Sequence, residues 1–182
     1  MKEKIRMGTM EDTAQILAIY DRILTMEEQK MTSIGWKRGI YPTERTIQEA
    51  LREHELFVME GLSEETGSSR VVGAARINHI QVPEYAQAHW EYPDIPDEEV
   101  LVLHTLVIDP VCSGKGYGTA FVEFYENYAK TMGCRSLRMD TNEKNIPARR
   151  LYHRLGFSER GIIPCVFQGI EGVWLVCLEK KI

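Results

Sequence analysis

The sequence lacks the features by which several classes of protein are recognised. Its four cysteines, Cys112, Cys134, Cys165 and Cys177, form no CxxC pair, and no histidine cluster stands beside them at the spacing of a zinc site. We therefore expect no bound metal. Scattered single cysteines are typical of buried thiols in a reducing cytosol, which favours a cytoplasmic protein.

Long apolar runs and an excess of basic residues are also missing. No stretch reaches the roughly 18 apolar residues that a membrane-spanning helix needs, and the first residues, MKEKIRMGTMEDTAQ, contain no apolar signal segment. Lys and Arg number 22 against 27 Asp and Glu, which gives a net charge of −5. Because non-specific nucleic-acid binding depends on clustered cations, we expect a cytoplasmic protein that binds neither nucleic acid nor membrane.

What is present indicates an α/β protein. The 182 residues contain no internal repeat and no low-complexity linker, so we expect a single domain over residues 1–182. Apolar spacing predicts strands near residues 4–7, 55–60, 70–77, 100–108, 135–141, 158–163 and 172–179, and helices near residues 14–24, 43–54, 118–132 and 145–155. This order predicts a mixed sheet of about seven strands flanked by about four helices.

The segment DPVCSGKGYGTAFVEFY, residues 109–125, places three glycines within five positions between a strand and a helix. It is not a Walker A loop, because Gly116 follows Lys115 where Ser or Thr is required. It is not a dinucleotide-binding turn either, because Phe121 occupies the last small position. Glycines still let backbone N–H groups converge, and a helix N-terminus adds free N–H groups and a positive dipole end. The segment predicts a pyrophosphate site; the alternative is a tight turn without a ligand.

Two motifs together resemble the GNAT superfamily of N-acetyltransferases. HTLVIDPVCSGKGYGTAFVEFYENYA is similar to the family's acetyl-CoA-binding segment, [Q/R]-x-x-G-x-[G/A], with both glycines in place and Ser113 where Gln or Arg is usual. NEKNIPARRLYHRLGF is similar to the family's N-x-x-A-x-x-x-Y-x-x-x-G-F. Its matching residues are Asn145, Ala148, Tyr152, Gly156 and Phe157. The two segments cover residues 103–157 and are separated by one predicted strand, as the family arrangement requires.

The resemblance implies a GNAT-like, mostly antiparallel sheet that splays open at the strand ending near Ile108. The pantetheine arm of acetyl-CoA would pair with the exposed backbone of Leu106, Val107 and Ile108, and the N–H near Val107 would face the thioester oxygen. Asn145 would hydrogen-bond the pantetheine. The other implied contacts with acetyl-CoA come from the glycine turn and the second motif: Ser113, Gly114, Lys115, Gly116, Tyr117, Gly118, Thr119, Ala148 and Tyr152.

The chemistry that the resemblance implies is direct attack of a substrate amine on the thioester. Tyr152 is carried over as the general acid that protonates the leaving thiolate; without the motif it reads as a core aromatic. A protonated amine cannot attack, so a base is needed. His104, with a free pKa of about 6.5, shares by alternation the strand face of Val102 and Leu106; a buried, hydrogen-bonded histidine is the alternative. Glu98 and Glu99 at the strand entry are the rival bases.

Aromatic residues in the predicted loops are candidates for the acceptor pocket. Trp36 and Tyr41 lie in a glycine-containing loop, and Trp90 lies in a long connector before the strand Val100–Ile108. Loops of that length in a compact domain are often functional. The alternative is aromatic packing beneath the loops.

The resulting hypothesis is an enzyme that moves the acetyl group of acetyl-CoA to the primary amine of a small molecule, without a metal. Two alternatives stay open. The acceptor is a protein amino terminus or lysine, or the chain is a non-catalytic module that binds acyl-CoA. The sequence does not decide whether the chain forms a homodimer.

Overall fold

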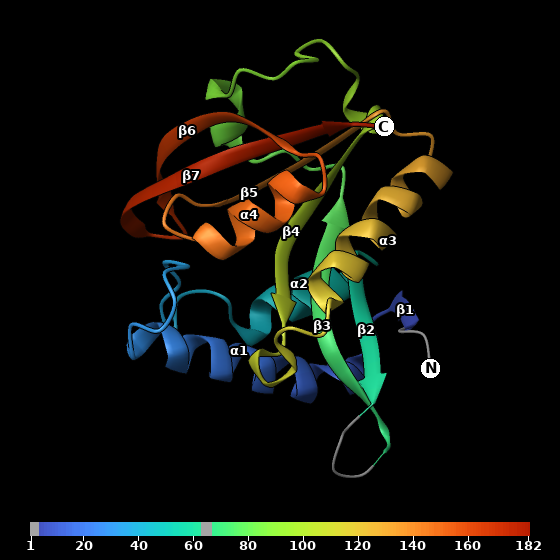
Figure 1. Ribbon diagram of the computed structural model, residues 1–182, viewed down its shortest axis with the longest axis vertical. Helices are drawn as coiled ribbons and strands as arrows, with labels where there is room; N and C mark the ends of the chain where they lie inside the picture. The colour runs from blue at the N-terminus through green and yellow to red at the C-terminus, as the bar shows by residue number, and fades with distance from the viewer. Residues whose placement is uncertain (1–3, 63–66) are drawn as a thin grey trace.

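The computed structural model describes residues 4–62 and 67–182, which form a seven-stranded sheet with helices on both faces (Figure 1). The strands are β1 (Lys4–Met7), β2 (Leu56–Leu62), β3 (Ser69–Asn78), β4 (Val100–Ile108), β5 (Ser136–Asn142), β6 (Ser158–Phe167) and β7 (Ile170–Lys181). The α-helices are α1 (Thr13–Glu28), α2 (Glu44–Arg52), α3 (Tyr117–Thr131) and α4 (Ile146–Arg154). The predicted order of strands and helices is confirmed.

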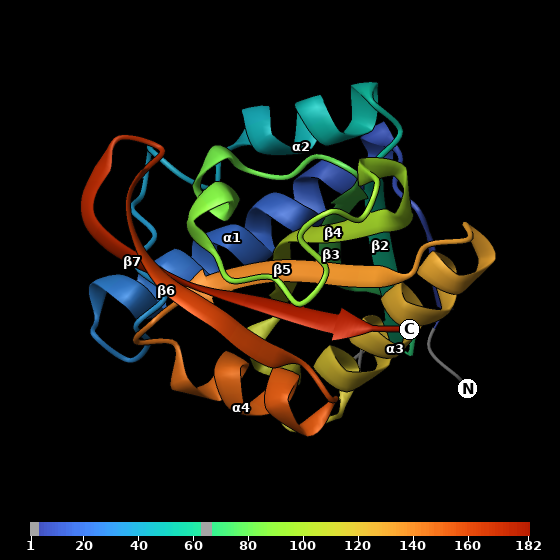
Figure 2. The same ribbon diagram turned by 90° about the horizontal axis from the view of Figure 1, so that it is seen from above.

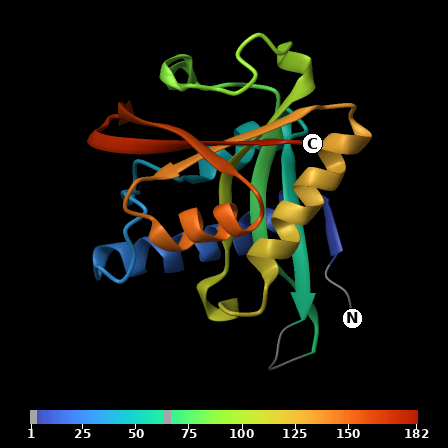
Figure 3. The ribbon, with the colours of Figure 1, turned by 45° about the horizontal axis from the view of Figure 1, so that its top comes forward.

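The sheet divides at its one parallel pair. Across the sheet the order is β1-β2-β3-β4-β5-β7-β6, and every neighbouring pair except β4–β5 is antiparallel. The β4–β5 register runs only from Val100↔Ser136 to Leu103↔Met139. Beyond Leu103, β4 continues to Ile108 beside β3, whereas β5 stays paired with β7 (Figure 3). The predicted splay near Ile108 is therefore confirmed.

Helices cover the two faces of the sheet in pairs. Figure 2 shows α1 and α2 on one side of the sheet and α3 and α4 on the other. In α3, Phe121, Tyr125 and Ala129 recur at four-residue spacing and are fully buried against the sheet. Burial of the Phe121 ring and of the Tyr125 ring each stabilises the fold by about 1.5–3 kcal/mol. None of the described helices is long and apolar enough to span a membrane.

The β6–β7 hairpin is longer than the sequence predicts. Pro164 made the second half of β6 unrecognisable as a strand in the sequence, because proline lacks the N–H group that a strand ladder uses. It is tolerated here because β6 is an edge strand of the sheet. The two turn residues, Gln168 and Gly169, have φ angles of 50° and 81°, the left-handed geometry that suits a two-residue hairpin. The turn brings Phe167, the last residue of β6, to the tip of the hairpin.

A buried carboxylate fixes the turn between β4 and α3. Asp109 is fully buried, and it accepts two hydrogen bonds from Arg22, at 2.8 and 2.9 Å, and one from Arg70 at 2.8 Å. It also accepts from the N–H of Val111. Since a buried charge is stable only when paired, these contacts hold the glycine turn at the end of β4.

Candidate active site

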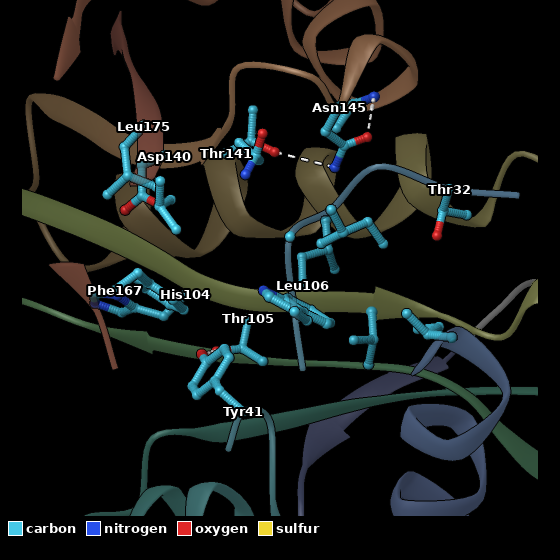
Figure 4. Close-up of a pocket in the computed structure, with 18 of the residues that line it drawn as sticks. Thr32, Tyr41, His104, Thr105, Leu106, Asp140, Thr141, Asn145, Phe167 and Leu175 are labelled. Carbon is cyan, nitrogen blue, oxygen red and sulfur yellow. Dashed lines mark hydrogen bonds between the residues drawn. The ribbon is translucent and has the colours of Figure 1, made fainter. Parts of the chain in front are cut away.

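A cavity of about 290 Å³ lies where β4 and β5 separate (Figure 4). Its walls come from β4, β5, the start of α4, the loop between α1 and α2, and the tip of the β6–β7 hairpin. Several predicted site residues line it together: Trp36, Tyr41, His104, Leu106, Val107, Ile108, Asn145, Ala148 and Tyr152. The divided sheet thus brings the second motif and the end of β4 to one hollow.

A β-bulge in β4 shapes the floor of this cavity. The β3 register passes from Ala74↔Val107 to Arg76↔His104, so β4 carries one extra residue. Thr105 has a φ of 51°, a left-handed conformation that costs about 1–3 kcal/mol in a non-glycine residue. Its hydroxyl is hydrogen-bonded to the Tyr41 hydroxyl, which helps to hold the bulge.

The bulge overturns one prediction about strand faces. Val102 packs with Tyr85 and Val100 on one side of the sheet, whereas Leu106 packs with the cluster beneath α3 and α4. His104, Val102 and Leu106 therefore do not share a face, because the extra residue reverses the alternation beyond Thr105. Among the described residues, the backbone edge of β4 beyond Leu103 that faces away from β3 has no strand partner.

Tyr152 lies on α4 in the cavity wall. It is 7% exposed, and its ring meets that of Phe157 edge-on at 6.1 Å. Burial, and next the charge of Asp140, raise the pKa of its hydroxyl. Within the described part of the chain this hydroxyl makes no hydrogen bond, and it is not sealed off by protein atoms. It is a protonated donor facing the cavity.

Asn145 caps α4 from the same wall. Its Oδ1 accepts from the N–H of Ala148 at 3.4 Å, and its Nδ2 donates to Thr141 Oγ1 at 3.1 Å, as Figure 4 shows. An N-cap asparagine begins a helix in this way. Within the described chain the second amide hydrogen of Asn145 makes no hydrogen bond.

The glycine turn begins where the cavity ends. Ile108 and Pro110 line the cavity, and Gly114 and Gly116 follow with φ angles of 79° and 80°. A Cβ on either glycine would meet no atom within 4 Å, so both are required for conformation and not for space. Gly118 instead allows α3 to approach α4, because a Cβ there would lie 3.2 Å from Leu151 Cδ2. Ser113, Lys115, Tyr117 and Thr119 complete the turn and the first helical residues, at least partly exposed.

The predicted bases lie in different places, and Glu99 stands beside Glu98 outside the cavity. His104 lines the cavity, and burial, followed by the charge of Arg76, lowers its pKa to about 4. Its Nε2 is 2.8 Å from Asn78 Oδ1, an oxygen that only accepts, so Nε2 carries the hydrogen. Glu98 is exposed on the short helix Asp97–Glu99 at the opposite end of β4, away from the cavity.

Of the predicted acceptor aromatics, the structure brings two to the cavity. Trp36 and Tyr41 meet edge-on at 5.6 Å, and Tyr41 meets Phe167 edge-on at 4.9 Å. Trp90 does not line the cavity; it packs against Tyr85 at 5.1 Å. Phe167 was missed by sequence reasoning because the end of β6 was not recognised as a strand.

The loop between α1 and α2 is anchored by Glu27. The Thr32 hydroxyl and the N–H groups of Ile34 and Gly35 donate to its carboxylate at 2.6, 2.9 and 2.8 Å. A glutamate that accepts three such bonds orders the loop that carries Trp36. No sequence motif marks this contact.

The cavity also contains a carboxylate that sequence reasoning missed. Asp140 on β5 accepts a hydrogen bond from the Tyr85 hydroxyl at 2.9 Å. Burial raises its pKa to about 6, although the Tyr85 bond acts in the opposite direction. A single aspartate in an alternating strand carries no recognisable signal, so only the fold reveals it.

The fold and the site define an α/β protein whose divided sheet forms a ligand cavity next to a glycine turn at a helix N-terminus. The sequence profile of the Acetyltransferase (GNAT) family matches residues 19–157. The chain belongs to this family, and the resemblance seen in its two motifs is confirmed.

Relatives with curated descriptions match part of the chain. An uncharacterized N-acetyltransferase of Methanocaldococcus jannaschii is 30% identical over 77 residues, which is 42% of this chain and 49% of that protein. The uncharacterized N-acetyltransferase YycN of Bacillus subtilis is 27% identical over 88 residues, 48% of this chain and 55% of YycN. The matches span about half the length of these relatives.

Solved structures match nearly the whole chain. A GNAT-family acetyltransferase of Streptococcus agalactiae has a TM-score of 0.77 at 20% identity, over 99% of this chain and 95% of that chain. A phosphinothricin acetyltransferase of Sinorhizobium meliloti in complex with acetyl-CoA has a TM-score of 0.69 at 16% identity, over 100% and 89% of the two chains. At these identities the likeness shows the fold.

Proposed function

We propose that the protein transfers the acetyl group of acetyl-CoA to the primary amine of a small molecule. Family membership supports acetyl-CoA as the donor, and the Sinorhizobium meliloti neighbour holds acetyl-CoA in the same fold. The aromatic contact that closes the acceptor side of the cavity supports a small acceptor.

The residues present fit acetyl-CoA in two respects. The unpaired edge of β4 at Leu106–Ile108 offers backbone groups to an extended pantetheine arm, in the way that a peptide adds to a sheet edge. Gly114 and Gly116 leave open space in front of the N-terminus of α3, whose first N–H groups have no intrahelical partner and attract phosphate. When bound, acetyl-CoA supplies the thioester carbon.

Direct attack suits the side chains of the cavity. Among the described residues that line it there is no cysteine and no serine to form an acyl-enzyme. Cys112 is buried behind the glycine turn, with Arg70 donating to its sulfur at 3.0 Å. In this proposal Tyr152 gives its proton to the leaving thiolate sulfur. His104, neutral and held by Asn78, shapes the wall and takes no proton.

The contact between Tyr41 and Phe167 is the observation that most favours a small-molecule acceptor. It joins the α1–α2 loop to the tip of the β6–β7 hairpin, which lie side by side in Figures 1 and 3. The same loop also closes onto β5, since a Cβ on Gly35 would lie 2.5 Å from Asn142 Nδ2. A polypeptide acceptor needs an open groove, and these contacts bridge the acceptor side.

Free-thiol release from acetyl-CoA tests the proposal. The full chain is incubated with small primary amines, with lysine-containing peptides and with peptides that have free amino termini, and products are identified by mass spectrometry. We expect thiol release that depends on a small amine and yields its acetylated form. Faster acetylation of the peptides would favour a protein acceptor, and acetyl-CoA binding without release for any amine would favour the non-catalytic module.

A further inference from the structure

The described residues of the cavity wall carry one formal charge at neutral pH, that of Asp140. Among the described residues that line it there is no lysine or arginine, and Asp140 is the one carboxylate. Among the described lining residues, His104 is the one that could become a cation, and its lowered pKa of about 4 leaves it uncharged at neutral pH. The pKa of Asp140, about 6, leaves that carboxylate largely ionised at pH 7 and above.

Asp140 lies at the point where the sheet divides. It follows Met139, the last β5 residue paired with β4, and it remains opposite Cys177 of β7. Its Oδ2 is fixed by the Tyr85 hydroxyl. Within the described chain Oδ1 makes no hydrogen bond and is not sealed off by protein, so it is open to the cavity. One oxygen is held and the other can receive a ligand.

The charge of the carboxylate acts on both the proposed acid and the aromatic wall. Its charge adds to burial in raising the pKa of Tyr152, and it acts on Tyr41 as well, whose pKa is about 12 mainly through burial. Other titratable groups coupled to Asp140 come from the short helix Pro83–Gln87 and from β6 and β7: Glu84, Tyr85, Cys165 and Cys177. None of these groups is a cation.

The other described residues of the cavity wall carry no formal charge, and several of those on the proposed acceptor side are apolar. Phe167, Val173 and Leu175 come from the β6–β7 hairpin, and Val82 and Trp36 come from the two long loops. Such a wall accommodates an alkyl chain or an aromatic ring, and ring faces also attract an ammonium group. An acceptor with a carboxylate or phosphate would bury that anion beside Asp140 without a cationic partner, which is strongly unfavourable.

Resting on the proposed function, we infer that the acceptor is a primary monoamine with an alkyl or aryl-alkyl body and no anionic group, bound and deprotonated by Asp140. One N–H bond of the ammonium breaks and its proton moves to Oδ1. The neutral nitrogen forms a bond to the thioester carbon as the carbon–sulfur bond breaks. The sulfur takes the Tyr152 proton, the second proton of the amine restores Tyr152, and the Asp140 proton passes to water.

Three acceptors with the same body test the charge rule. The probes are 2-phenylethylamine, L-phenylalanine and L-phenylalanine amide, in which an uncharged group replaces the carboxylate. We expect kcat/KM for 2-phenylethylamine to exceed that for L-phenylalanine about 100-fold or more, and the amide to recover most of the difference. Equal or better use of L-phenylalanine would overturn the inference and leave the proposed function standing. No turnover of any amine would overturn the proposed function itself.

Variants at Asp140 test its role. Asp140→Asn keeps an acceptor for the Tyr85 hydroxyl, and we expect it to lower kcat/KM for 2-phenylethylamine about 100-fold or more while leaving the Kd of acetyl-CoA unchanged. In the wild type, kcat/KM should fall as the pH is lowered below about 6, and in Asp140→Asn this fall should be absent. Asp140→Glu, which keeps a carboxylate, should restore part of the rate. An unchanged rate or pH profile in a variant that still binds acetyl-CoA would overturn the assignment.

Discussion

Replacing Tyr152 with phenylalanine removes one hydroxyl and leaves the ring packing in place. The ring keeps its edge-on contact with Phe157, and within the described chain the hydroxyl has no hydrogen-bond partner to lose. We therefore expect the free energy of unfolding to change by less than about 0.5 kcal/mol. Any large loss of activity would then come from the chemistry and not from the fold.

The expected effect on turnover is large. A positioned general acid contributes about 10²–10⁴-fold, which corresponds to about 2.7–5.4 kcal/mol of activation free energy at 1.36 kcal/mol per factor of ten. Because burial raises the pKa of Tyr152, the wild-type hydroxyl stays protonated across the neutral range. The Tyr152→Phe defect in kcat, followed by thiol release at saturating amine, should therefore be the same at pH 7 and pH 9.

Binding separates the acid role from a packing role. The Kd of acetyl-CoA, measured by calorimetry, should change less than about twofold in Tyr152→Phe. Tyr128→Phe on α3, whose ring stacks on Phe124 outside the cavity, is the matched control and should leave kcat unchanged. A kcat for Tyr152→Phe within about threefold of wild type, or equal losses in kcat and in affinity, would refute the reasoning.

Three further variants test the electrostatics and the glycine turn. The pKa of His104 is about 4 in the folded protein and about 6.5 in the unfolded chain. The unfolded chain therefore takes up the proton first, and the free energy of unfolding falls as the pH falls from 6.5 toward 4. His104→Gln should remove up to about 2.5 kcal/mol of this loss at pH 4.5, measured by urea unfolding. Asp109→Asn leaves Arg22 and Arg70 without their buried carboxylate and should cost about 3 kcal/mol. Gly116→Ala forces a side chain into a left-handed φ of 80° and should cost about 1–2 kcal/mol and weaken acetyl-CoA binding.

Each of these variants has a control elsewhere on the molecule. His89→Gln changes an exposed histidine and should leave the acid sensitivity unaltered. Asp21→Asn breaks an exposed pair with Arg38 and should cost less than about 1 kcal/mol. Gly133→Ala has a similar φ of 76° at the far end of α3 and should destabilise without affecting acetyl-CoA binding. If a control behaves like its partner variant, the cause assigned to that partner is wrong.

Local patterns in the sequence were sufficient for the order of elements and for the donor motifs. A helix or strand is recognised from the spacing of apolar residues over a short segment. A helix cap or a glycine turn is recognised from residues that are adjacent in the chain. Tyr152 and Asn145 could be named because they stand at fixed spacing on one short helix. Their contacts with acetyl-CoA stay a prediction.

Tertiary structure decided which residues line the side of the cavity that we propose for the acceptor. The bulge at Thr105 depends on pairing with β3 and on a hydroxyl contact with Tyr41, 64 residues away in the chain. Asp140 and Phe167 reach the cavity because β5 diverges from β4 and because the turn at Gln168 and Gly169 places Phe167 at the tip of the β6–β7 hairpin. Glu98 lies at the opposite end of β4 and Trp90 packs against Tyr85, so neither lines the cavity.

The sequence by itself thus determined the order of the helices and strands and the two family motifs, because these depend on residues close together in the chain. The tertiary structure decided that Asp140 and Phe167 line the cavity and that Trp90 does not. The positions of these residues depend on where β4 and β5 diverge and on how the loops pack across the two strands. The spacing of neighbouring residues in the sequence predicts neither the divergence nor the packing.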